Sequence, residues 1–306
     1  MSIAAVAHTG SGPESGGEPP PQPPGRRSWL PYLLLLPGLA WLAVFFAVPI
    51  VTLFGTSTQT PVPGGDIGEF VQTFRFANYA DAIGEYSEQF IRSFLYAGIA
   101  TALALAIGYP LAYLIAFKAG RWRNILLVLV VAPFFTSFIL RTIAWKQILA
   151  EEGFVVSSLK GLHLIPQDMN VTASAVAVVA GITYNFLPFM VLPLYASLER
   201  IDPRLIEAGG DLYGSAFAVL RKVTFPLSMP GVVAGTLLTF IPAAGDYVNA
   251  SLLGTTRTQM IGNVVESRFF RIVDYPTAAV LSFVLMAAIL VLVTLYIRRA
   301  GTEELV

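Results

Sequence analysis

Six long apolar runs constrain this chain more than any other feature of its sequence. A helix needs about twenty mainly apolar residues to cross the hydrocarbon core of a bilayer. The runs occupy residues 30–54, 93–117, 125–149, 173–198, 232–253 and 277–297. Charged residues make up only 12% of the chain and hydrophobic residues 55%, which is typical of an integral membrane protein. We therefore predict an all-α membrane protein with six transmembrane helices.

The distribution of Lys and Arg predicts which loops face the cytoplasm, where both residues are enriched. If the N-terminus lies inside, the cytoplasmic segments hold eleven of these residues and the outer segments six. Both termini, and the loop at about 199–228, are therefore predicted to be cytoplasmic. Residues 1–28 are rich in Gly, Pro and Ser, so we predict a disordered cytoplasmic tail before a membrane domain over residues 29–306.

Several function classes are disfavoured by what the sequence lacks. The chain has no cysteine and only two histidines, so thiolate and multi-histidine metal sites are not expected. Its formal net charge is zero, which gives no general attraction to nucleic acid. The sequence contains no G-x-x-x-x-G-K-[ST] phosphate loop, so ATP would have to act through another chain. We expect no catalytic residues, no metal ligands and no enzymatic activity in this chain.

Two loops between the apolar runs, the first outer loop and the cytoplasmic loop, are predicted to contain helices. The first outer loop, 55–92, contains the amphipathic segment 74–90, which is expected to cap the bundle or to lie on the membrane surface. In the cytoplasmic loop, Asp202 is a predicted N-cap with Pro203 at the first helical position. Gly209 and Gly210 are expected to loosen that helix, and a turn near Gly214 leads to a second short helix. The apolar side chains of this loop need a surface to bury against: Leu205, Ile206, Leu212, Phe217, Val219 and Leu220.

Residues 207–226 resemble the EAA loop of ABC importer permeases. The segment begins E-A-G and ends V-x-F-P, where the family has E-A-A and I-x-L-P. The central glycine of the family falls by spacing on Tyr213, and Gly214 follows one residue later. We expect either a turn that is shifted by one residue or a strained backbone at Tyr213.

The apolar runs extend this resemblance over most of the chain. GYPLAYLIA, APFFTSFILRTIAWKQIL and IPAAGDYVNASLLGTTRTQMIGNVVESRFF are similar to the spermidine/putrescine-type branch of these permeases. The resemblance implies a MetI-like bundle in the plasma membrane of a bacterium that imports a small cationic solute, such as a polyamine, by alternating access. That branch also includes importers of iron, opines and other small solutes, which stay open as alternatives.

The resemblance also implies partners. They are a second permease subunit, expected to be a different chain, two ATPase subunits that bind ATP and Mg, and an external substrate-binding protein. The cytoplasmic loop would be the coupling helix that docks into an ATPase subunit. The residues that the resemblance assigns to ATPase coupling are Glu207, Ala208, Gly209, Asp211, Tyr213, Gly214 and Pro226.

Charged residues inside a membrane are costly and usually face a cavity or a partner. Arg141 lies in the outer half of the third run and is predicted to pair with Asp246, to line the pathway, or to reach toward the outer surface. Asp246 is the preferred candidate for contact with a cationic solute, because Pro242 and Gly245 should disturb the fifth helix beside it. An ion pair with Arg141 or a position at a helix end is the alternative for Asp246.

Aromatic side chains near these charges are candidates for the walls of the pathway, because alkyl ammonium groups pack on aromatic faces. The candidates are Trp145, Tyr184 and Tyr247, together with Asn185 beside Tyr184. Ordinary packing inside the bundle is the alternative for each ring. A secondary transporter or channel and a membrane enzyme are the competing functions, but the chain has neither an evident internal repeat nor a catalytic cluster.

Overall fold

The computed structural model describes residues 30–163, 166 and 171–300. The part that it describes is almost entirely helical and divides into two units, Met1–Ile50 and Val51–Val306. The predicted cytoplasmic tail, residues 1–28, lies outside the described residues. The prediction of an all-α protein is confirmed, with one small hairpin as the exception in the described chain.

The chain begins with an apolar helix whose side chains are exposed. Helices α1 (Leu30–Leu42), η1 (Ala43–Ala47) and α2 (Val48–Ser57) follow one another without a break. Within them Leu33–Ser57, 25 residues long, is apolar enough to cross a membrane, and none of its most apolar window is buried. Such a helix is stable where acyl chains or another protein surround it, because its backbone hydrogen bonds are all internal.

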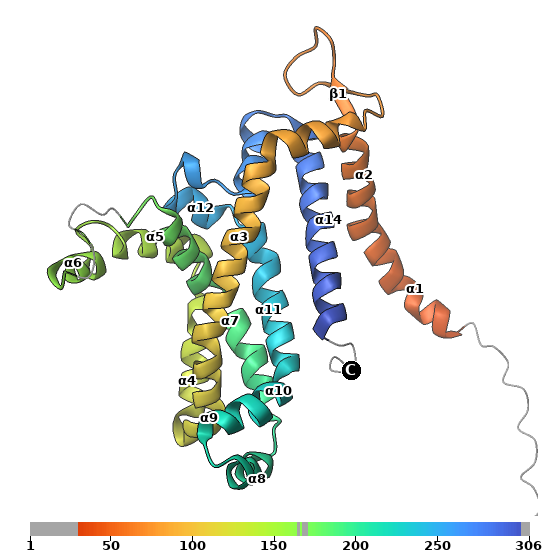
Figure 1. The fold of residues 1–306 in the computed structure, drawn as a ribbon. Helices are drawn as coiled ribbons and strands as arrows, with labels where there is room; N and C mark the ends of the chain where they lie inside the picture. Colours follow the sequence, from red (N-terminus) through yellow and green to blue (C-terminus); the bar gives the residue numbers. More distant parts are fainter. Residues whose placement is uncertain (1–29, 164–165, 167–170, 301–306) are drawn as a thin grey trace, which may run out of the picture. The chain divides into compact units, whose positions relative to one another are not determined.

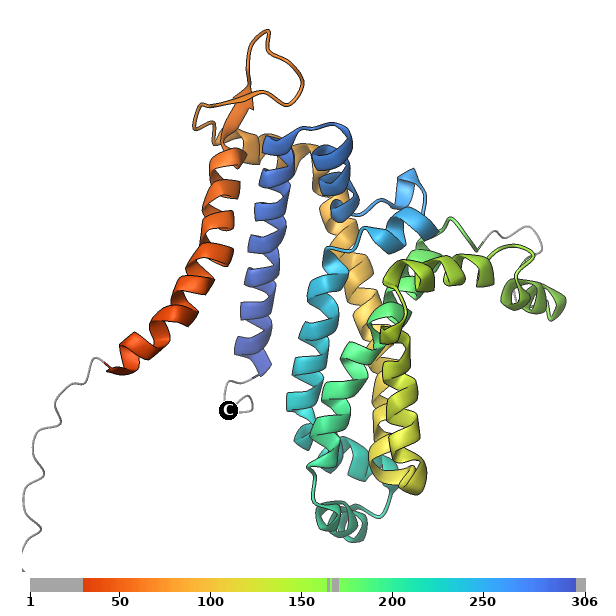
Figure 2. The ribbon, with the colours of Figure 1, turned by 180° about the vertical axis from the view of Figure 1, so that it is seen from behind.

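The second unit contains a short hairpin and the remaining helices, which Figures 1 and 2 show from opposite sides. Strands β1 (Gln59–Pro61) and β2 (Phe70–Gln72) are antiparallel, with Gln59 opposite Gln72. The helices that follow are α3 (Ala77–Tyr113), η2 (Leu114–Lys118), η3 (Gly120–Trp122), α4 (Arg123–Val131), η4 (Ala132–Phe135), α5 (Phe138–Ile148), α6 (Phe154–Gly161), α7 (Ala175–Glu199), α8 (Pro203–Tyr213), α9 (Ala216–Val219), η5 (Leu220–Thr224), α10 (Phe225–Leu227), α11 (Met229–Ala244), α12 (Val248–Leu253), η6 (Thr256–Thr258), α13 (Ile261–Glu266), η7 (Ser267–Arg271) and α14 (Tyr275–Ala300).

The number of spans depends on two bent pairs of helices. Four helical stretches of the described chain are long and apolar enough to cross a membrane: the first apolar helix, α3 with η2, α7 and α14. The pair from η3 to η4 followed by α5 is bent by 100°, and the pair from α9 to α10 followed by α11 is bent by 68°. The count reaches the predicted six when each bent pair is taken as one span.

The third run, predicted as one span over residues 125–149, is broken in the structure. Residues Thr136 and Ser137 are extended, with ψ angles of 152° and 137°, and the α5 helix starts only after them. The turn before them contains Pro133, which cannot donate a backbone hydrogen bond. Arg141 lies on α5, after the bend, and its location in the outer half of this run stays a prediction.

The segment 74–90, predicted as a separate amphipathic helix, forms most of the first part of α3. The helix therefore starts at Ala77, well before the predicted start at residue 93. It is kinked at Tyr86, where φ is −112° and ψ is 16°. Figure 1 shows this first part crossing the end of the bundle before α3 turns into it.

Helices α3, α7 and α11 form the centre of the bundle through small residues. Gly231 and Gly235, one turn apart on α11, face α7. A Cβ atom at Gly231 would lie 2.5 Å from Ser197 Cβ and 2.7 Å from the carbonyl oxygen of Pro193. Small residues of this kind allow membrane helices to approach until their backbones touch, which is the main source of packing energy in a bilayer.

The two ends of the second unit carry different charges. The α8–α9 loop, the basic start of α4 and the basic end of α14 lie toward one end, whereas the hairpin, α12 and α13 lie toward the other (Figures 1 and 2). This arrangement agrees with the predicted cytoplasmic location of the loops that are rich in Lys and Arg.

We predict that Gly231→Ala destabilises the bundle, because the added methyl group forces α7 and α11 apart. The expected loss is about 1–3 kcal/mol, the usual cost of overpacking, measured as a lower Tm of the purified protein in detergent. Gly210→Ala is the matched control, because a Cβ atom at this helical glycine would meet no atom within 4 Å. Equal melting temperatures for the two variants would contradict the close helix contact.

Candidate functional site

The first half of the cytoplasmic loop is a regular helix, as its capping residues predict. Asp202 Oδ1 accepts a hydrogen bond from the backbone nitrogen of Arg204 at 2.9 Å. Helix α8 then continues without interruption through Gly209 and Gly210, so the prediction that these glycines loosen it is wrong. Gly209 is buried, and a Cβ atom there would lie 3.1 Å from a Val223 methyl carbon. Its role is to let α8 pack closely on the following helix.

The turn after α8 is shifted by one residue from the family position. Gly214 has a left-handed backbone with φ of 68°, which glycine adopts at no steric cost, and caps the helix. Tyr213 ends the helix, and the described residues other than glycine that have positive φ do not include it. The alternative of a strained Tyr213 is therefore wrong. Its ring instead lies under the ammonium group of Lys222, 4.4 Å from Nζ.

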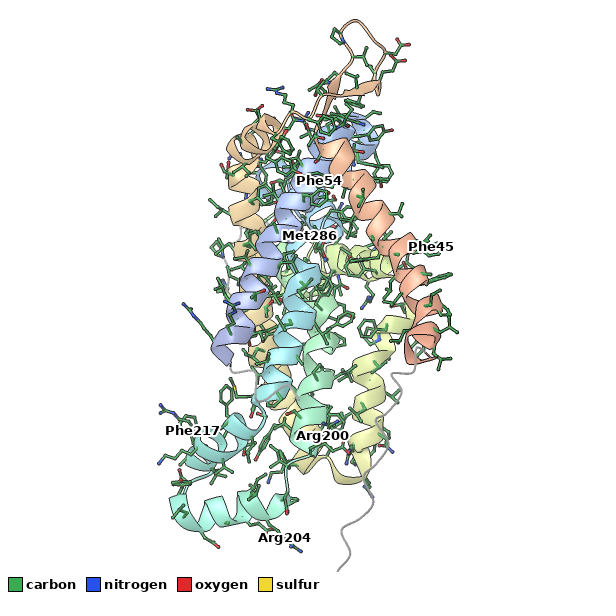
Figure 3. All side chains as sticks on the ribbon, turned by 90° about the vertical axis from the view of Figure 1, so that its right-hand side faces the viewer. Phe45, Phe54, Arg200, Arg204, Phe217 and Met286 are labelled. Atoms are coloured by element: carbon green, nitrogen blue, oxygen red, sulfur yellow. The ribbon has the colours of Figure 1, made fainter. Side chains whose placement is uncertain are left out.

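The second half of the loop presents apolar side chains to its surroundings. Ser215 Oγ accepts from the backbone nitrogen of Ala218 at 3.2 Å and starts α9. Leu212 and Phe217 on the two helices are 73% and 72% exposed, whereas Val219 is buried against α8. Figure 3 shows Phe217 on this helix pair, at the end of the bundle. The loop thus carries an apolar surface that the described part of this chain leaves uncovered.

The fifth run breaks before its predicted end at residue 253. Helix α11 has 16 residues, so it rises about 24 Å, less than the roughly 30 Å of a hydrocarbon core. It runs through Pro242 and stops before Gly245, and α12 begins only at Val248. The predicted disturbance of this helix is thus confirmed at Gly245, whereas Pro242 is accommodated. Backbone groups at such a break must find partners in the protein, because lipid offers none.

A buried polar cluster on three helices surrounds this break. Asp246 is 6% exposed, and its two carboxylate oxygens accept from the backbone nitrogen and from Nδ2 of Asn249 at 2.8 and 2.7 Å. Asn185 Nδ2, on α7, donates to Asn249 Oδ1 at 3.0 Å and to Thr142 Oγ1 at 3.1 Å. Thr142 Oγ1, on α5, is 3.3 Å from Asn249 Oδ1. We name these four residues, Asp246, Asn249, Asn185 and Thr142, the polar cluster.

The outer segment α13 holds the other side of the break. Asn263 is buried, and its Nδ2 donates to the backbone oxygen of Tyr247 at 2.9 Å and to Ser251 Oγ at 2.7 Å. The neighbouring Gly262 touches the break directly, because a Cβ atom there would lie 2.5 Å from the carbonyl oxygen of Gly245. The irregular backbone at 245–247 is therefore fixed by defined contacts.

Arg141 does not form the predicted ion pair with Asp246. The ion pairs within the described residues do not include either side chain. The carboxylate of Asp246 is engaged by Asn249, which is three residues away and thus always within reach. The guanidinium of Arg141 lies over the rings of Phe134 and Phe138, with its carbon 5.6 Å from each ring centre.

The three aromatic residues that were predicted to line the pathway lie in two different places. Trp145 and Tyr184 contact each other edge to face, with ring centres 5.2 Å apart, next to the polar cluster residue Asn185. Tyr247 is 47% exposed and lines a different groove of about 570 Å³ between α11, α13 and α14. The prediction that Tyr247 completes one wall with the other two rings is thus not supported by the structure.

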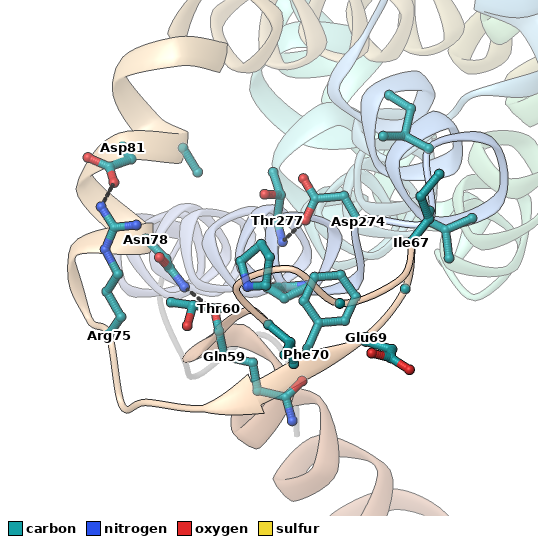
Figure 4. A pocket seen from close by; sticks show the side chains of 18 of the residues that line it. Gln59, Thr60, Ile67, Glu69, Phe70, Arg75, Asn78, Asp81, Asp274 and Thr277 are labelled. Carbon is teal, nitrogen blue, oxygen red and sulfur yellow. Dashed lines mark hydrogen bonds and ion pairs between the residues drawn. The ribbon is translucent and has the colours of Figure 1, made fainter.

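The outer end carries a pocket of about 460 Å³ between the hairpin, the start of α3 and the start of α14. Several carboxylates line it, and Figure 4 shows that Asp81 pairs with Arg75 and that Asp274 accepts from the backbone nitrogen of Thr277. Within the residues that the structure describes, no group of three or more His, Cys, Asp or Glu side chains is arranged to hold a metal ion.

Thr142 and Asn263 were missed by the sequence reasoning. Both are ordinary polar residues in or beside apolar runs, and a hydroxyl or amide in such a place gives no signal of its partner. One signal could have found them. Backbone groups that a helix break frees need hydrogen-bond partners from the protein, and Asn and Thr side chains at the same depth of the membrane can supply them.

The comparisons with known proteins agree on one protein family. Residues 104–300 match the model of the family described as binding-protein-dependent transport system inner membrane component. The spermidine/putrescine transport system permease protein PotB of Salmonella typhimurium is 35% identical over 264 residues, which cover 86% of this chain and 91% of that protein. PotB of Escherichia coli is 34% identical over 264 residues, covering 86% and 94% of the two chains.

Among solved structures, a chain of a bacterial ABC transporter that imports the acidic polysaccharide alginate has the same fold. Its TM-score is 0.66 at 18% identity, covering 90% of this chain and 96% of that chain. A further structure of a bacterial alginate transporter, in complex with its alginate-bound periplasmic protein, gives a TM-score of 0.63 at 18% identity, covering 91% and 96%.

We predict that Thr142→Val destabilises the protein by about 1–3 kcal/mol, because it leaves the buried amides of Asn185 and Asn249 short of a partner. The expected observation is a lower Tm of the purified protein in detergent. Thr142→Ser is the matched control, since it keeps the hydroxyl group and should stay close to the wild type. If the valine variant were as stable as the serine variant, the polar cluster would not contribute to stability.

Proposed function

Because this chain belongs to the binding-protein-dependent transport system inner membrane components, and is therefore a multi-pass permease subunit of a bacterial ABC importer, we propose that it imports an alkyl-ammonium solute of the polyamine type. In such importers ATP is bound by a separate ATPase subunit, so this chain is the transport component and not an enzyme. The names of the two PotB relatives support the polyamine class, at moderate identity.

The observation that carries this proposal is the environment of Asp246. It is a buried carboxylate at a helix break within the membrane, and it has no cationic partner among the described residues. An ionised carboxylate offers about four acceptor positions, of which Asn249 occupies two and the backbone of Val248 a further one. The remaining position suits an ammonium group, which carries three donors and a full positive charge.

The walls near this carboxylate suit the rest of such a solute. Trp145 and Tyr184 offer aromatic surface one helical turn from the polar cluster, and the methylene groups of a polyamine pack well on such rings. Asn185 fixes the position of Asn249, which in turn orients Asp246. We propose Asp246 as the residue that contacts the solute and Asn185 as a positioning residue.

The cytoplasmic loop is proposed to dock on the ATPase subunit. The contacts would come from the exposed apolar side chains Leu212 and Phe217, while Glu207, Ala208, Gly209, Asp211 and Pro226 shape or flank the helix pair. Docking buries the apolar area that this chain leaves uncovered, and the left-handed cap at Gly214 fixes the angle between the two helices. A rigid pair of this kind transmits a rigid-body movement of the ATPase to α7 and α11 during alternating access.

Two further partners complete the proposal. A second permease subunit, a different chain, would enclose the pathway together with this one, and an external binding protein would dock at the outer end. The pocket between the hairpin, α3 and α14 supports the second contact, because its exposed acids and amides can form a polar interface rim.

We predict that Leu212→Ser combined with Phe217→Ser weakens binding to the ATPase subunit by about tenfold or more, because the apolar anchors are lost. The measurement is the amount of ATPase that co-purifies with the permease, together with ATP-dependent uptake in proteoliposomes. Ile67→Ser is the matched control, since Ile67 is 87% exposed at the outer end and should leave ATPase binding unchanged. Normal co-purification of the double variant would contradict the docking surface.

We predict that Asp246→Asn lowers kcat/KM for spermidine uptake by about tenfold or more, because an ammonium group loses a charged acceptor. ATPase co-purification should stay normal, and Glu152→Gln, an exposed acid in the turn after α5, should transport like the wild type. Unchanged uptake by Asp246→Asn would remove this residue from the pathway. If the wild-type complex hydrolyses ATP but takes up no polyamine, the solute class is wrong and the permease function stands.

A further inference from the structure

Four phenylalanine rings contact one another at the bend of the third span, and two of them lie against one charged group. Phe134 and Phe138 flank the bend, and Phe186 and Phe189 face them from α7. Ring centres are 4.9 Å apart for Phe134 and Phe189, 6.0 Å for Phe138 and Phe186, and 6.1 Å for Phe186 and Phe189. The guanidinium carbon of Arg141 is 5.6 Å from the centres of both Phe134 and Phe138. We name these four rings the aromatic cage.

The charge of Arg141 is held by these rings and not by a carboxylate. Its Nε and Nη1 atoms are buried and have no hydrogen-bond partner among the described residues. An isolated charge at membrane depth is costly, and a structural arginine is normally paired with an acid or with backbone carbonyls. The rings of Phe134 and Phe138 compensate part of this cost, because a cation is attracted to the face of a desolvated ring.

The aromatic cage lies beside the polar cluster. Thr142, the residue after Arg141, contacts Asn249, and Asn249 binds Asp246. Phe186 likewise follows Asn185 directly on α7. Thr142 Oγ1 also donates to the backbone oxygen of Phe138 at 3.0 Å, so the polar cluster and the rings that hold Arg141 share one turn of α5. An aromatic cage is also a recognised binding environment for alkyl-ammonium groups.

We propose that Arg141 is a tethered cation that occupies a cation site of the transport pathway at rest, blocks other cations there, and is displaced by the ammonium group of the solute. The proposal rests on the proposed function, since it assumes a cationic solute at Asp246. A fixed positive charge in a narrow pathway repels small cations, which a transporter in an energised membrane must exclude. The same charge raises the concentration of solute needed for uptake, because the solute competes for the rings.

Removal of the charge tests both consequences in the assembled transporter, reconstituted with its ATPase, second permease and binding protein. Arg141→Met keeps an unbranched chain but no charge, and it should increase passive K⁺ flux without ATP by about tenfold. It should also lower KM for spermidine by about threefold, with ATPase assembly unchanged. Arg141→Lys keeps a cation and should retain the low K⁺ flux. Lys146→Met, an exposed position on the same helix, is the matched control and should change neither quantity.

The outcomes separate this proposal from simpler roles of Arg141. Unchanged K⁺ flux and unchanged KM in Arg141→Met would overturn it, and so would a higher KM, which would indicate that Arg141 binds an anionic part of the solute. If Arg141→Met does not assemble, Phe138→Leu provides the test, because it removes one ring while keeping an apolar side chain. It should raise K⁺ flux, and an unchanged flux would overturn the proposal. The K⁺ flux does not depend on the solute, so its result stands even if the solute is not a polyamine.

Discussion

The candidate site depends on the helix break at residues 245–247. The hydrogen bond from Asn263 Nδ2 to the backbone oxygen of Tyr247 holds this break in place. A broken helix inside a bilayer is stable only if the protein supplies partners for its freed backbone groups. Asn263 supplies one from the outer side, and Asp246 supplies another by capping the backbone nitrogen of Asn249. The break is thus a rigid feature that holds the Asp246 carboxylate against Asn249, and the amide oxygen of Asn249 in turn contacts Asn185 on α7 and Thr142 on α5.

The sequence predicted features that depend on neighbouring residues in the chain. The cap at Asp202, the helix pair of the cytoplasmic loop and the break at Gly245 follow from local preferences, and the structure contains all three. The bend at Thr136–Ser137 was not predictable in the same way, because its stability comes from the rings of Phe186 and Phe189 on another helix. Hydropathy reports only that a segment is apolar, so a bent span and a straight span look alike.

The same distinction explains the error over Arg141 and Asp246. Opposite charges within two apolar runs suggest an ion pair, because each pays a desolvation cost that the other could offset. Asp246, however, accepts two hydrogen bonds from Asn249 in the short helix that follows it, at little entropic cost. The local hydrogen bonds from Asn249 form in place of the long-range ion pair with Arg141. The sequence alone does not show which of these two contacts the tertiary packing allows.

The separation of the two charges has a functional consequence. A direct Arg141–Asp246 pair would neutralise both groups and leave no field in the pathway. In the structure, the positive charge lies against the rings of Phe134 and Phe138, and the negative charge is bound by Asn249. Under the roles proposed above, Asp246 attracts a cationic solute while Arg141 repels ions that cannot compete for aromatic surface. Discrimination between an alkyl-ammonium group and a hydrated metal cation would then follow, because both are attracted by Asp246 but only the former also gains energy from the rings.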